Sequence, residues 1–244
     1  MVTEVTTLGT VSNLLLTILL IIGSYLLGSV PWAYLITRWR RGIDIRKHGS
    51  GNVGASNVLT TVSKRWSIAV TILDIGKGAL MVWIAQLVGL GVAQQAIIGI
   101  AAVIGHDWPV FLGFQGGRGV FTTLGVITML NPWLGLIALV SPYLFFAPFK
   151  QLSMGVTLVL IILPIIGGFA GQPLGVAEPL PVSVGIAWMF IIMMVRRFTA
   201  PRSPISASVP VRELILYRFL FDRDIRDRET WINQDRSEEE TEQE

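Results

Sequence analysis

Residues 119–148 read GVFTTLGVITMLNPWLGLIALVSPYLFFAP, and this apolar stretch decides how often the chain crosses a membrane. A spanning helix needs roughly 20 predominantly apolar residues. The stretch is too long for one such helix and shorter than the roughly 40 residues that two full helices need. Pro132 disfavours a helix that continues through that point. The stretch therefore predicts two short helices with a tight turn at Asn131-Pro132.

Apolar runs on either side of this stretch predict five further spanning helices. The composition agrees, because 52% of the residues are hydrophobic and 14% are charged, against about 25% charged in soluble domains. The first run follows a segment with Glu4 and no Lys or Arg, so we expect a retained helix rather than a cleaved signal peptide. We predict an all-α integral membrane protein of seven helices, the other five at 13–37, 67–91, 93–113, 153–171 and 181–195.

The basic residues provide a test of this helix count. With seven helices, all of the 19 Lys and Arg residues except Lys77 fall on one side of the membrane. The positive-inside rule places that side in the cytoplasm, with the N-terminus outside and the C-terminus inside. A single helix over 119–148 would send the basic tail to the other side, so the charge asymmetry favours the break at Asn131-Pro132.

The last part of the chain differs in character from the bundle. We divide the chain into a membrane-embedded bundle, residues 1–197, and a cytoplasmic tail, residues 198–244. Within the tail, residues 210–228 mix apolar side chains with arginines. This pattern predicts an amphipathic helix, lying either on an anionic lipid leaflet or packed under the bundle. The acidic end, 237–244, has no apolar residue, and we expect it to be disordered.

The first motif segment, residues 43–60, reads IDIRKHGSGNVGASNVLT and combines glycines with cations and short polar side chains. Its GSGNVG matches a dinucleotide fingerprint only formally, because it follows a membrane helix rather than a strand. Glycines permit positive φ and close backbone approach, and successive N–H groups can form an anion nest. The segment predicts a phosphate or oxyanion site, the alternative being a flexible surface loop. Its candidate residues are Arg46, Lys47, Gly49, Ser50, Gly51, Asn52, Gly54, Ser56 and Asn57.

The second motif segment, residues 105–123, reads GHDWPVFLGFQGGRGVFTT and repeats this theme. Gly116, Gly117 and Arg118 form a compact glycine turn with one guanidinium, before a helix whose N-terminus can face an anion. The predicted topology places both motif segments on one side, so both could bind one ligand. Taken alone, this turn is more typical of a tight interhelical connection whose arginine anchors the interface.

Ionisable residues inside the predicted spans form a third group. Asp74 and Lys77 lie three residues apart on one helix face, and we interpret them as a structural ion pair. His106 is either a proton carrier or hydrogen-bond donor, or a buried, satisfied histidine. Ser29 brings a hydroxyl to a point where Pro31 frees backbone groups. The chain has no cysteine and two histidines, so we expect no metal site.

The order of the motifs resembles the bacterial acyl-phosphate-dependent glycerol-3-phosphate acyltransferases. The resemblance is carried by GSVP (28–31), IDIRKHGSGNVGASNVL (43–59), LDIGKG (73–78) and GHDWPVFLGFQGGRGV (105–120). It implies a seven-helix bundle in the bacterial inner membrane with cytoplasmic motif segments. It also implies transfer of a fatty acyl group from acyl phosphate to sn-glycerol 3-phosphate, giving lysophosphatidate and phosphate in phospholipid biosynthesis, without a cofactor.

The resemblance and the loop chemistry together suggest roles for individual residues. Acyl phosphate is already activated, so positioning and charge stabilisation can outweigh a strong nucleophile. We assign catalytic roles to Ser50, Asn52 and His106. We assign substrate or phosphate binding to Ser29, Arg46, Lys47, Gly49, Gly51, Gly54, Asn57, Gly116, Gly117 and Arg118.

The chain also departs from the family pattern. The family usually has Arg at the place of Thr60, Lys at the places of Gln115 and Arg118, and Thr at that of Ser56. A third motif with a His and an Asn, expected after the last helix, is not recognisable in RRFTAPRSP (196–204). The place of its two polar residues is taken by Arg197 and Ala200.

Two further hypotheses stand beside the acyltransferase. One is a transporter or binding protein for a phosphorylated small molecule or lipid, and the other is an inactive homologue. No internal repeat of the kind found in many transporters is visible, and the glycine-rich segments lie at the interface, so we favour the acyltransferase. Its partners are acyl phosphate, sn-glycerol 3-phosphate and membrane lipids, with no nucleic acid, and the oligomeric state is left open.

Overall fold

Residues 2–232 are described by the computed structural model, with side chains from residue 12 onward except Pro204. Within these residues the chain forms α-helices and short 3-10 turns, and no strand. The acidic end, predicted to be disordered, lies outside the described residues. The predicted all-helical fold is confirmed for the part of the chain that is described.

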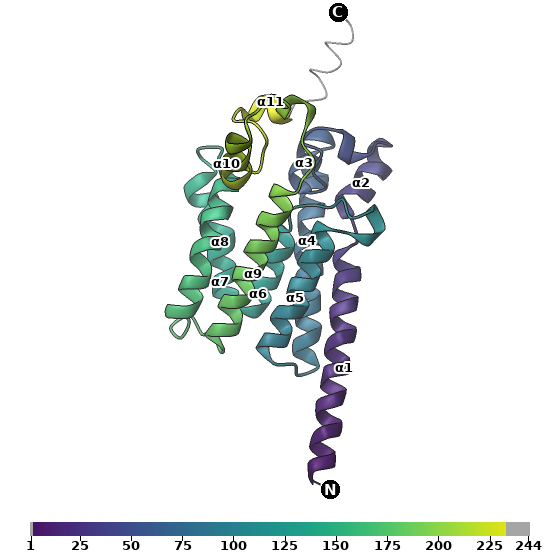
Figure 1. Ribbon diagram of the computed structural model, residues 1–244, viewed down its shortest axis with the longest axis vertical. Coiled ribbons are helices and arrows are strands. Elements are labelled where there is room, and N and C mark those ends of the chain that lie inside the picture. Colours follow the sequence, from purple (N-terminus) through teal and green to yellow (C-terminus); the bar gives the residue numbers. More distant parts are fainter. Residues whose placement is uncertain (1, 233–244) are drawn as a thin grey trace, which may run out of the picture.

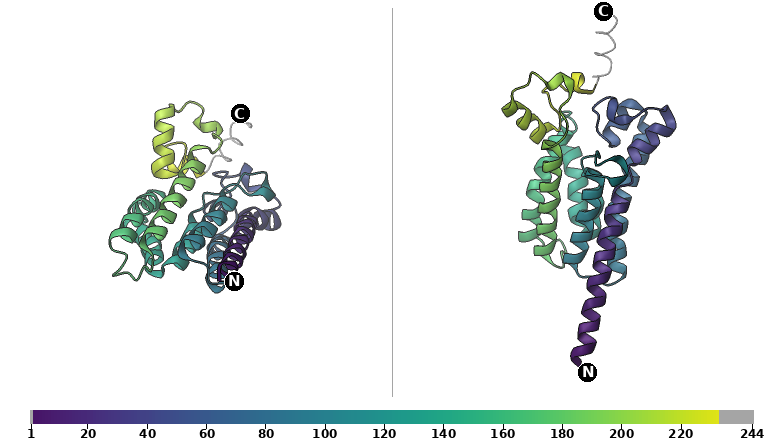
Figure 2. Two further views of the ribbon diagram at one scale, coloured as in Figure 1. Left: turned by 60° about the horizontal axis from the view of Figure 1, so that its bottom comes forward. Right: turned by 45° about the vertical axis from the view of Figure 1, so that its right-hand side comes forward.

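Most of the helices run side by side in a bundle, and the others gather at one of its ends (Figures 1 and 2). The bundle helices are α1 (Val2–Gly28), α4 (Lys64–Leu87), α5 (Val92–Asp107), α6 (Val120–Leu130), α7 (Pro132–Phe146), α8 (Leu152–Phe169) and α9 (Pro179–Phe198). The helices at the end of the bundle are α2 (Trp32–Arg41), α3 (Ala55–Thr61), α10 (Val211–Phe221) and α11 (Arg228–Ile232).

The predicted turn at Asn131-Pro132 is present between α6 and α7. Asn131 has an extended backbone, and its Oδ1 accepts a hydrogen bond of 2.9 Å from the Leu134 N–H. Pro132 occupies the first turn of α7, where a missing N–H costs no helical hydrogen bond. Asn131 therefore caps α7 at the point where α6 ends.

The first predicted span, 13–37, is wrong as one continuous helix. α1 ends at Gly28, and the chain resumes as α2 only at Trp32. Pro31 has no N–H for the helical ladder, and its ring disfavours the α conformation of the residue before it. For the same reason α5 ends at Asp107, before Pro109, rather than at the predicted residue 113.

The helices pack around an apolar core and leave apolar side chains on the outside. α1 packs on α5, α4 on α6, and α9 on both α5 and α8. The core contains Val103, Ile127 and Met189, each fully buried. Outward-facing Leu87 and Ile72 are 65% and 63% exposed, as suits a lipid-facing surface. Five helical segments are long and apolar enough to cross a membrane, whereas α6 and α7 are shorter apolar helices.

The tail folds back onto the bundle. α10 packs on α8 and α9 with Leu214 and Arg218 buried, which favours a helix packed under the bundle over one lying on lipid alone. The predicted helix over 210–228 is too long. α10 ends at Phe221 because Asp222 takes a left-handed backbone conformation with φ of 54°.

Candidate functional site

Asn57 is the centre around which the first motif segment folds. Its Nδ2 donates to the carbonyls of Ile45, His48 and Asn52 at 3.2, 2.9 and 3.1 Å. Its Oδ1 accepts from the Ser50 N–H at 3.2 Å, and the residue is 1% exposed. These bonds occupy the amide, so the structure gives Asn57 a framework role rather than the predicted contact with phosphate.

Two glycines of this segment have backbone conformations that other residues adopt at a cost. Gly49 and Gly51 have φ of 57° and 67°. A Cβ on Gly49 would also overlap Oδ1 of Asn57. These glycines let the chain wrap around the Asn57 amide, and both line the adjoining cavity. Residues 55–61, predicted as part of a loop, form the short helix α3.

Arg46 is held in place by a carboxylate that the sequence reasoning did not single out. Its Nη2 lies 2.6 Å from Oδ2 of Asp44 and its Nε lies 3.0 Å from Oδ1. The guanidinium also lies 5.6 Å from the ring of Tyr34. The hydrogen bond from Arg46 lowers the pKa of Asp44 despite the opposing effect of burial. The sequence feature that could have revealed this pair is the Asp-x-Arg spacing, which the structure places at a 3-10 turn.

The glycine turn of the second motif segment closes against the end of α5. The N–H groups of Gly116 and Gly117 donate to the carbonyls of Asp107 and His106 at 3.2 and 3.1 Å. A Cβ on Gly117 would overlap Nε2 of His106. Only glycine lets the turn lie directly on the His106 ring.

His106 joins the predicted ion pair in one buried polar cluster. Lys77 Nζ lies 3.0 Å from Oδ1 of Asp74 and 2.8 Å from Nδ1 of His106. Lys77 also donates to the Val30 carbonyl at 3.4 Å, at the break between α1 and α2. A charged Lys77 donates to Nδ1, which leaves Nε2 to carry the ring proton. Ser29 accepts from the Val110 N–H at 3.4 Å and so ties this break to the second motif segment.

Arg196 is a residue of the site that sequence reasoning missed. It lies in the last turn of α9 and donates from Nε to the Gly117 carbonyl at 3.1 Å and from Nη2 to the Gly116 carbonyl at 2.9 Å. Arg118 donates in turn to the Arg196 carbonyl at 3.3 Å. The sequence signal that could have revealed Arg196 is the pair of arginines, Arg196 and Arg197, directly after the last predicted span.

A cavity of about 320 Å³ lies where both motif segments meet the tail. Ser50 and Asn52 line it, and Oδ1 of Asn52 is buried without a hydrogen-bond partner among the described residues. Asp74, Lys77, His106 and Ser29 lie outside it, below the glycine turn. Its cationic lining is Arg46, Lys47, Arg118, Arg196 and Arg202.

Two further cavities follow this one toward the bundle, each sharing lining residues with the one before it. A cavity of about 130 Å³ is also lined by Asn52 and Arg118, and it reaches His106. An almost wholly apolar cavity of about 60 Å³ lies between α6, α7 and α8. It has Val120 and Leu152 in common with the 130 Å³ cavity. The three cavities change from cationic at the end of the bundle to apolar between its helices.

Comparisons with known proteins point to one family. The sequence model of the family described as "Glycerol-3-phosphate acyltransferase" matches residues 18–205. Glycerol-3-phosphate acyltransferase 4 of Dehalococcoides mccartyi (strain CBDB1) is 47% identical over 216 residues, 88% of this chain and 93% of that protein. Glycerol-3-phosphate acyltransferase 5 of Dehalococcoides mccartyi (strain ATCC BAA-2266 / KCTC 15142 / 195) is 46% identical over 216 residues, 88% of this chain and 92% of that protein.

A solved structure resembles the chain along most of its length. The crystal structure of PlsY (YgiH), an integral membrane glycerol 3-phosphate acyltransferase, in its glycerol 3-phosphate form superposes with a TM-score of 0.70 at 29% identity. The match covers 86% of this chain and 95% of that one. The helical fold, the motif segments around a cationic cavity and these relatives lead to one conclusion: the chain belongs to the glycerol-3-phosphate acyltransferase family.

Proposed function

We propose that the chain transfers a fatty acyl group from acyl phosphate to sn-glycerol 3-phosphate, producing lysophosphatidate and inorganic phosphate. The observation that carries this proposal is the set of cavities that change from cationic to apolar. An acyl phosphate has a phosphate head and an apolar tail, which match the cationic and the apolar cavities respectively. The cationic end also has room for glycerol 3-phosphate, since a cavity of about 320 Å³ falls in the range of small-molecule sites.

The reaction needs positioning and charge stabilisation rather than a protein nucleophile. The hydroxyl oxygen of glycerol 3-phosphate attacks the carbonyl carbon of the acyl phosphate and forms the ester bond. The bond from this carbon to the phosphate oxygen breaks, and phosphate leaves with the electron pair. The hydroxyl proton passes to an oxygen of the departing phosphate, because the Ser50 hydroxyl is already protonated and His106 has one nitrogen bonded to Lys77 and the other protonated. Arg46, Arg118 and Arg196 stabilise the charge on the two phosphates and on the developing oxyanion.

The proposed roles divide the site residues by position. We assign contact with substrate to Arg46, Lys47, Ser50, Asn52 and Arg118, all of which line the 320 Å³ cavity. Gly49, Gly51, Gly54, Gly116 and Gly117 would contribute close approach of the backbone to the substrates, since the N–H groups of Gly51, Gly116 and Gly117 are already bonded within the protein. The cluster of Asp74, Lys77 and His106 would support the glycine turn from below and keep His106 oriented.

The proposed membrane arrangement retains seven crossings, with the motif segments and tail in the cytoplasm of a bacterial cell and the N-terminus outside. α6 and α7 have 11 and 15 residues, or about 17 and 23 Å of helix at 1.5 Å per residue. This is shorter than the roughly 30 Å hydrocarbon core. α6 packs between α4, α5, α7 and α9, so protein rather than lipid would surround most of its length. The proposed division remains a bundle over 1–197 and a tail over 198–244.

The test is turnover by the purified full-length chain in a lipid mesophase. Palmitoyl phosphate and glycerol 3-phosphate are supplied together, and lysophosphatidate and phosphate are measured. We expect equal amounts of both products and no lysophosphatidate when either substrate is omitted. A folded protein that makes neither product would overturn the proposal and leave the inactive homologue as the better description.

A further inference from the structure

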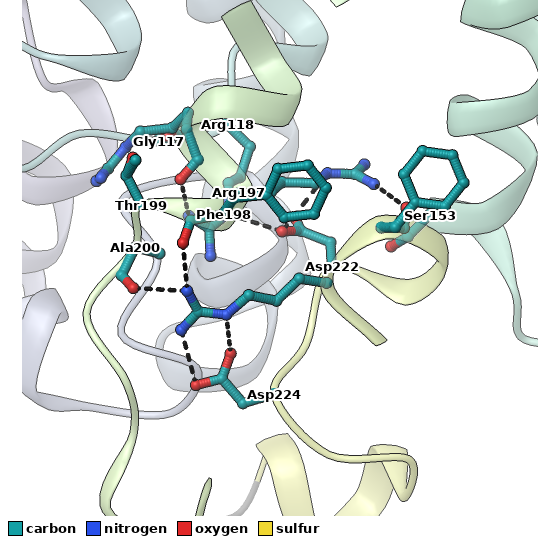
Figure 3. A network of polar contacts seen from close by, with 12 residues as sticks. Gly117, Arg118, Ser153, Arg197, Phe198, Thr199, Ala200, Asp222 and Asp224 are labelled. Atoms are coloured by element: carbon teal, nitrogen blue, oxygen red, sulfur yellow. Dashed lines mark hydrogen bonds and ion pairs between the residues drawn. The ribbon is translucent and has the colours of Figure 1, made fainter. Parts of the chain in front are cut away.

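Asp222 of the tail contacts two arginines that come from different parts of the bundle. Its Oδ1 lies 2.8 Å from Nε of Arg118 and 3.6 Å from Nε of Arg197 (Figure 3). The three side chains are largely buried, with 16%, 14% and 1% of their surface exposed. An ion pair with so little access to water is screened only weakly.

The tail holds Asp222 at this point through a separate buried ion pair. Arg218 Nε donates to Oδ1 of Asp224 at 2.7 Å, and its Nη1 donates to the carbonyls of Phe198 and Ala200 at 2.9 and 2.7 Å (Figure 3). The second oxygen of Asp224 accepts from the Ser203 N–H at 3.0 Å. These bonds join the end of α9 to α10 and to the turn that follows it.

Arg197, on the bundle side, also bonds to the tail near Asp222. Its Nη1 donates to Oγ1 of Thr157 at 2.8 Å and to the Phe219 carbonyl at 3.0 Å. α8, α9 and α10 therefore meet at one side chain. Asp222, one turn beyond Phe219, has little freedom to move away from Arg118.

The contacts of Arg118 leave one of its nitrogens available to a ligand. Nε lies in ion-pair contact with Oδ1 of Asp222, and Nη1 donates to the Arg196 carbonyl. Nη2 has no bond to any of the residues that the structure describes. Arg118 lines the 320 Å³ cavity, the 130 Å³ cavity and another cavity of about 480 Å³, which lies between the first motif segment, the start of α8 and the tail. Asp222 also offsets the positive charges of Arg118 and Arg197, which would otherwise repel each other in a poorly hydrated place.

We propose that Asp222 is a positioning residue of the site, which orients Arg118 toward the phosphate of a substrate. The tail is then part of the phosphate-binding machinery and not an appendage to it. The inference rests on the proposed function for the identity of the phosphate compounds. Its physical content, that Asp222 sets phosphate affinity through Arg118, can be measured separately from turnover.

The test begins with Asp222→Asn in the full-length chain. Asn keeps the size of the side chain and also tolerates the left-handed backbone, so the loss is mainly one of charge. We expect glycerol 3-phosphate to bind about tenfold more weakly by calorimetry, the loss typical of one charge-assisted contact, with a similar fall in kcat/KM. Glu213→Gln is the matched control, since it removes the same charge from an exposed position on α10, and we expect wild-type affinity.

A double-mutant cycle decides whether Asp222 acts through Arg118. In an Arg118→Gln background, Asp222→Asn should weaken binding no further, because the side chain that it orients is gone. Additive losses would overturn the inference, as would wild-type affinity in Asp222→Asn with only a lower Tm. Wild-type protein that binds glycerol 3-phosphate but makes no lysophosphatidate would refute the proposed function and leave the affinity comparison to decide this inference. Wild-type protein that does not bind it would refute both.

Discussion

At the scale of single residues, two asparagines of the first motif segment differ in what they bond to. Asn57 is hydrogen-bonded to the backbone at four points. Asn52 leaves its Oδ1 buried and without a partner among the described residues, at a point where the cavities meet. A buried polar atom without a partner costs stability, which a ligand can offset. The two side chains therefore predict opposite results on truncation.

We expect Asn52→Ala to impair catalysis without loss of stability. The change removes a polar group from the cavity and leaves no backbone group unpaired. By analogy with removal of one donor from an oxyanion hole, kcat/KM should fall about 100-fold or more. Steady-state kinetics and thermal unfolding measured by circular dichroism check this result. Wild-type kinetics in the variant would remove Asn52 from the site.

Asn57→Ala is the contrasting change, and we expect it to lower Tm. The variant leaves the Asn52 carbonyl and the Ser50 N–H without a partner among the described residues, whereas the carbonyls of Ile45 and His48 keep their backbone hydrogen bonds. Each unpaired buried group costs about 1–3 kcal/mol unless water reaches it. Hydrogen exchange should show faster exchange at residues 45–54. A variant with wild-type Tm and exchange would show that the amide does not organise the segment.

The sequence predicts an anion-binding segment here, which stays a prediction, but it could not separate these two asparagines. Both have the same side chain, and their roles depend on which backbone groups the fold brings within reach. Arg196 was missed for a related reason, because its acceptor, the Gly117 carbonyl, lies 79 positions earlier in the chain. Asp44, in contrast, was within reach of local reasoning, since it pairs with Arg46 two residues away.

At the scale of elements, apolar runs predicted the bundle helices well and their ends less well. The break at Asn131-Pro132 was predictable because an asparagine cap and a proline coincide with an excess of length. The break at Ser29 was missed because the apolar run continues past Pro31 to Ile36. The end of α10 depends on the conformation of Asp222, whose carboxylate is held by Arg118 and Arg197, and no local pattern reports such a contact.

The pairing of Arg218 with Asp224 predicts that acid loosens the tail. Burial raises the pKa of Asp224, but the hydrogen bonds from Arg218, Ser203 and Ser206 outweigh it and lower the pKa below its usual value. Because the pKa of Asp224 is lower in the folded state than in the unfolded state, ionised Asp224 stabilises the docked tail at pH values above the unfolded-state pKa of about 3.9. This stabilisation is lost as the pH falls through the folded-state pKa. We therefore expect α10 to undock below about pH 4.

This undocking can be followed by the distance between two spin labels. The chain has no native cysteine, so nitroxides attached at exposed positions 216 on α10 and 64 on α4 report only that distance. We expect one narrow distance distribution at pH 7 and a broad one at pH 3. Asp224→Asn should broaden the distribution at pH 7 and weaken its pH dependence. A narrow distribution for the wild type at both pH values would contradict the prediction.

At the scale of the whole molecule, the motif segments and the tail lie at the same end of the bundle (Figure 1). The proposed orientation predicts which cysteines an impermeant maleimide can reach in intact cells. Gln172→Cys, in the connection between α8 and α9, should be labelled from outside. Glu229→Cys, on α11, should be labelled only after the membrane is opened. The reverse pattern would invert the proposed topology, and labelling of both positions in intact cells would contradict it.

The change from cationic to apolar lining has a consequence for how the rate depends on each substrate. Under the proposed function, glycerol 3-phosphate reaches the site by diffusion in three dimensions, so the turnover rate depends on its bulk concentration. The acyl phosphate reaches the site by lateral diffusion in two dimensions, so the turnover rate depends on its mole fraction among the lipids. Adding inert lipid at a constant total amount of acyl phosphate should therefore slow turnover, because it lowers the mole fraction of acyl phosphate in the membrane. Diluting the vesicles with buffer should leave the dependence of the rate on acyl phosphate unchanged, because that mole fraction stays the same.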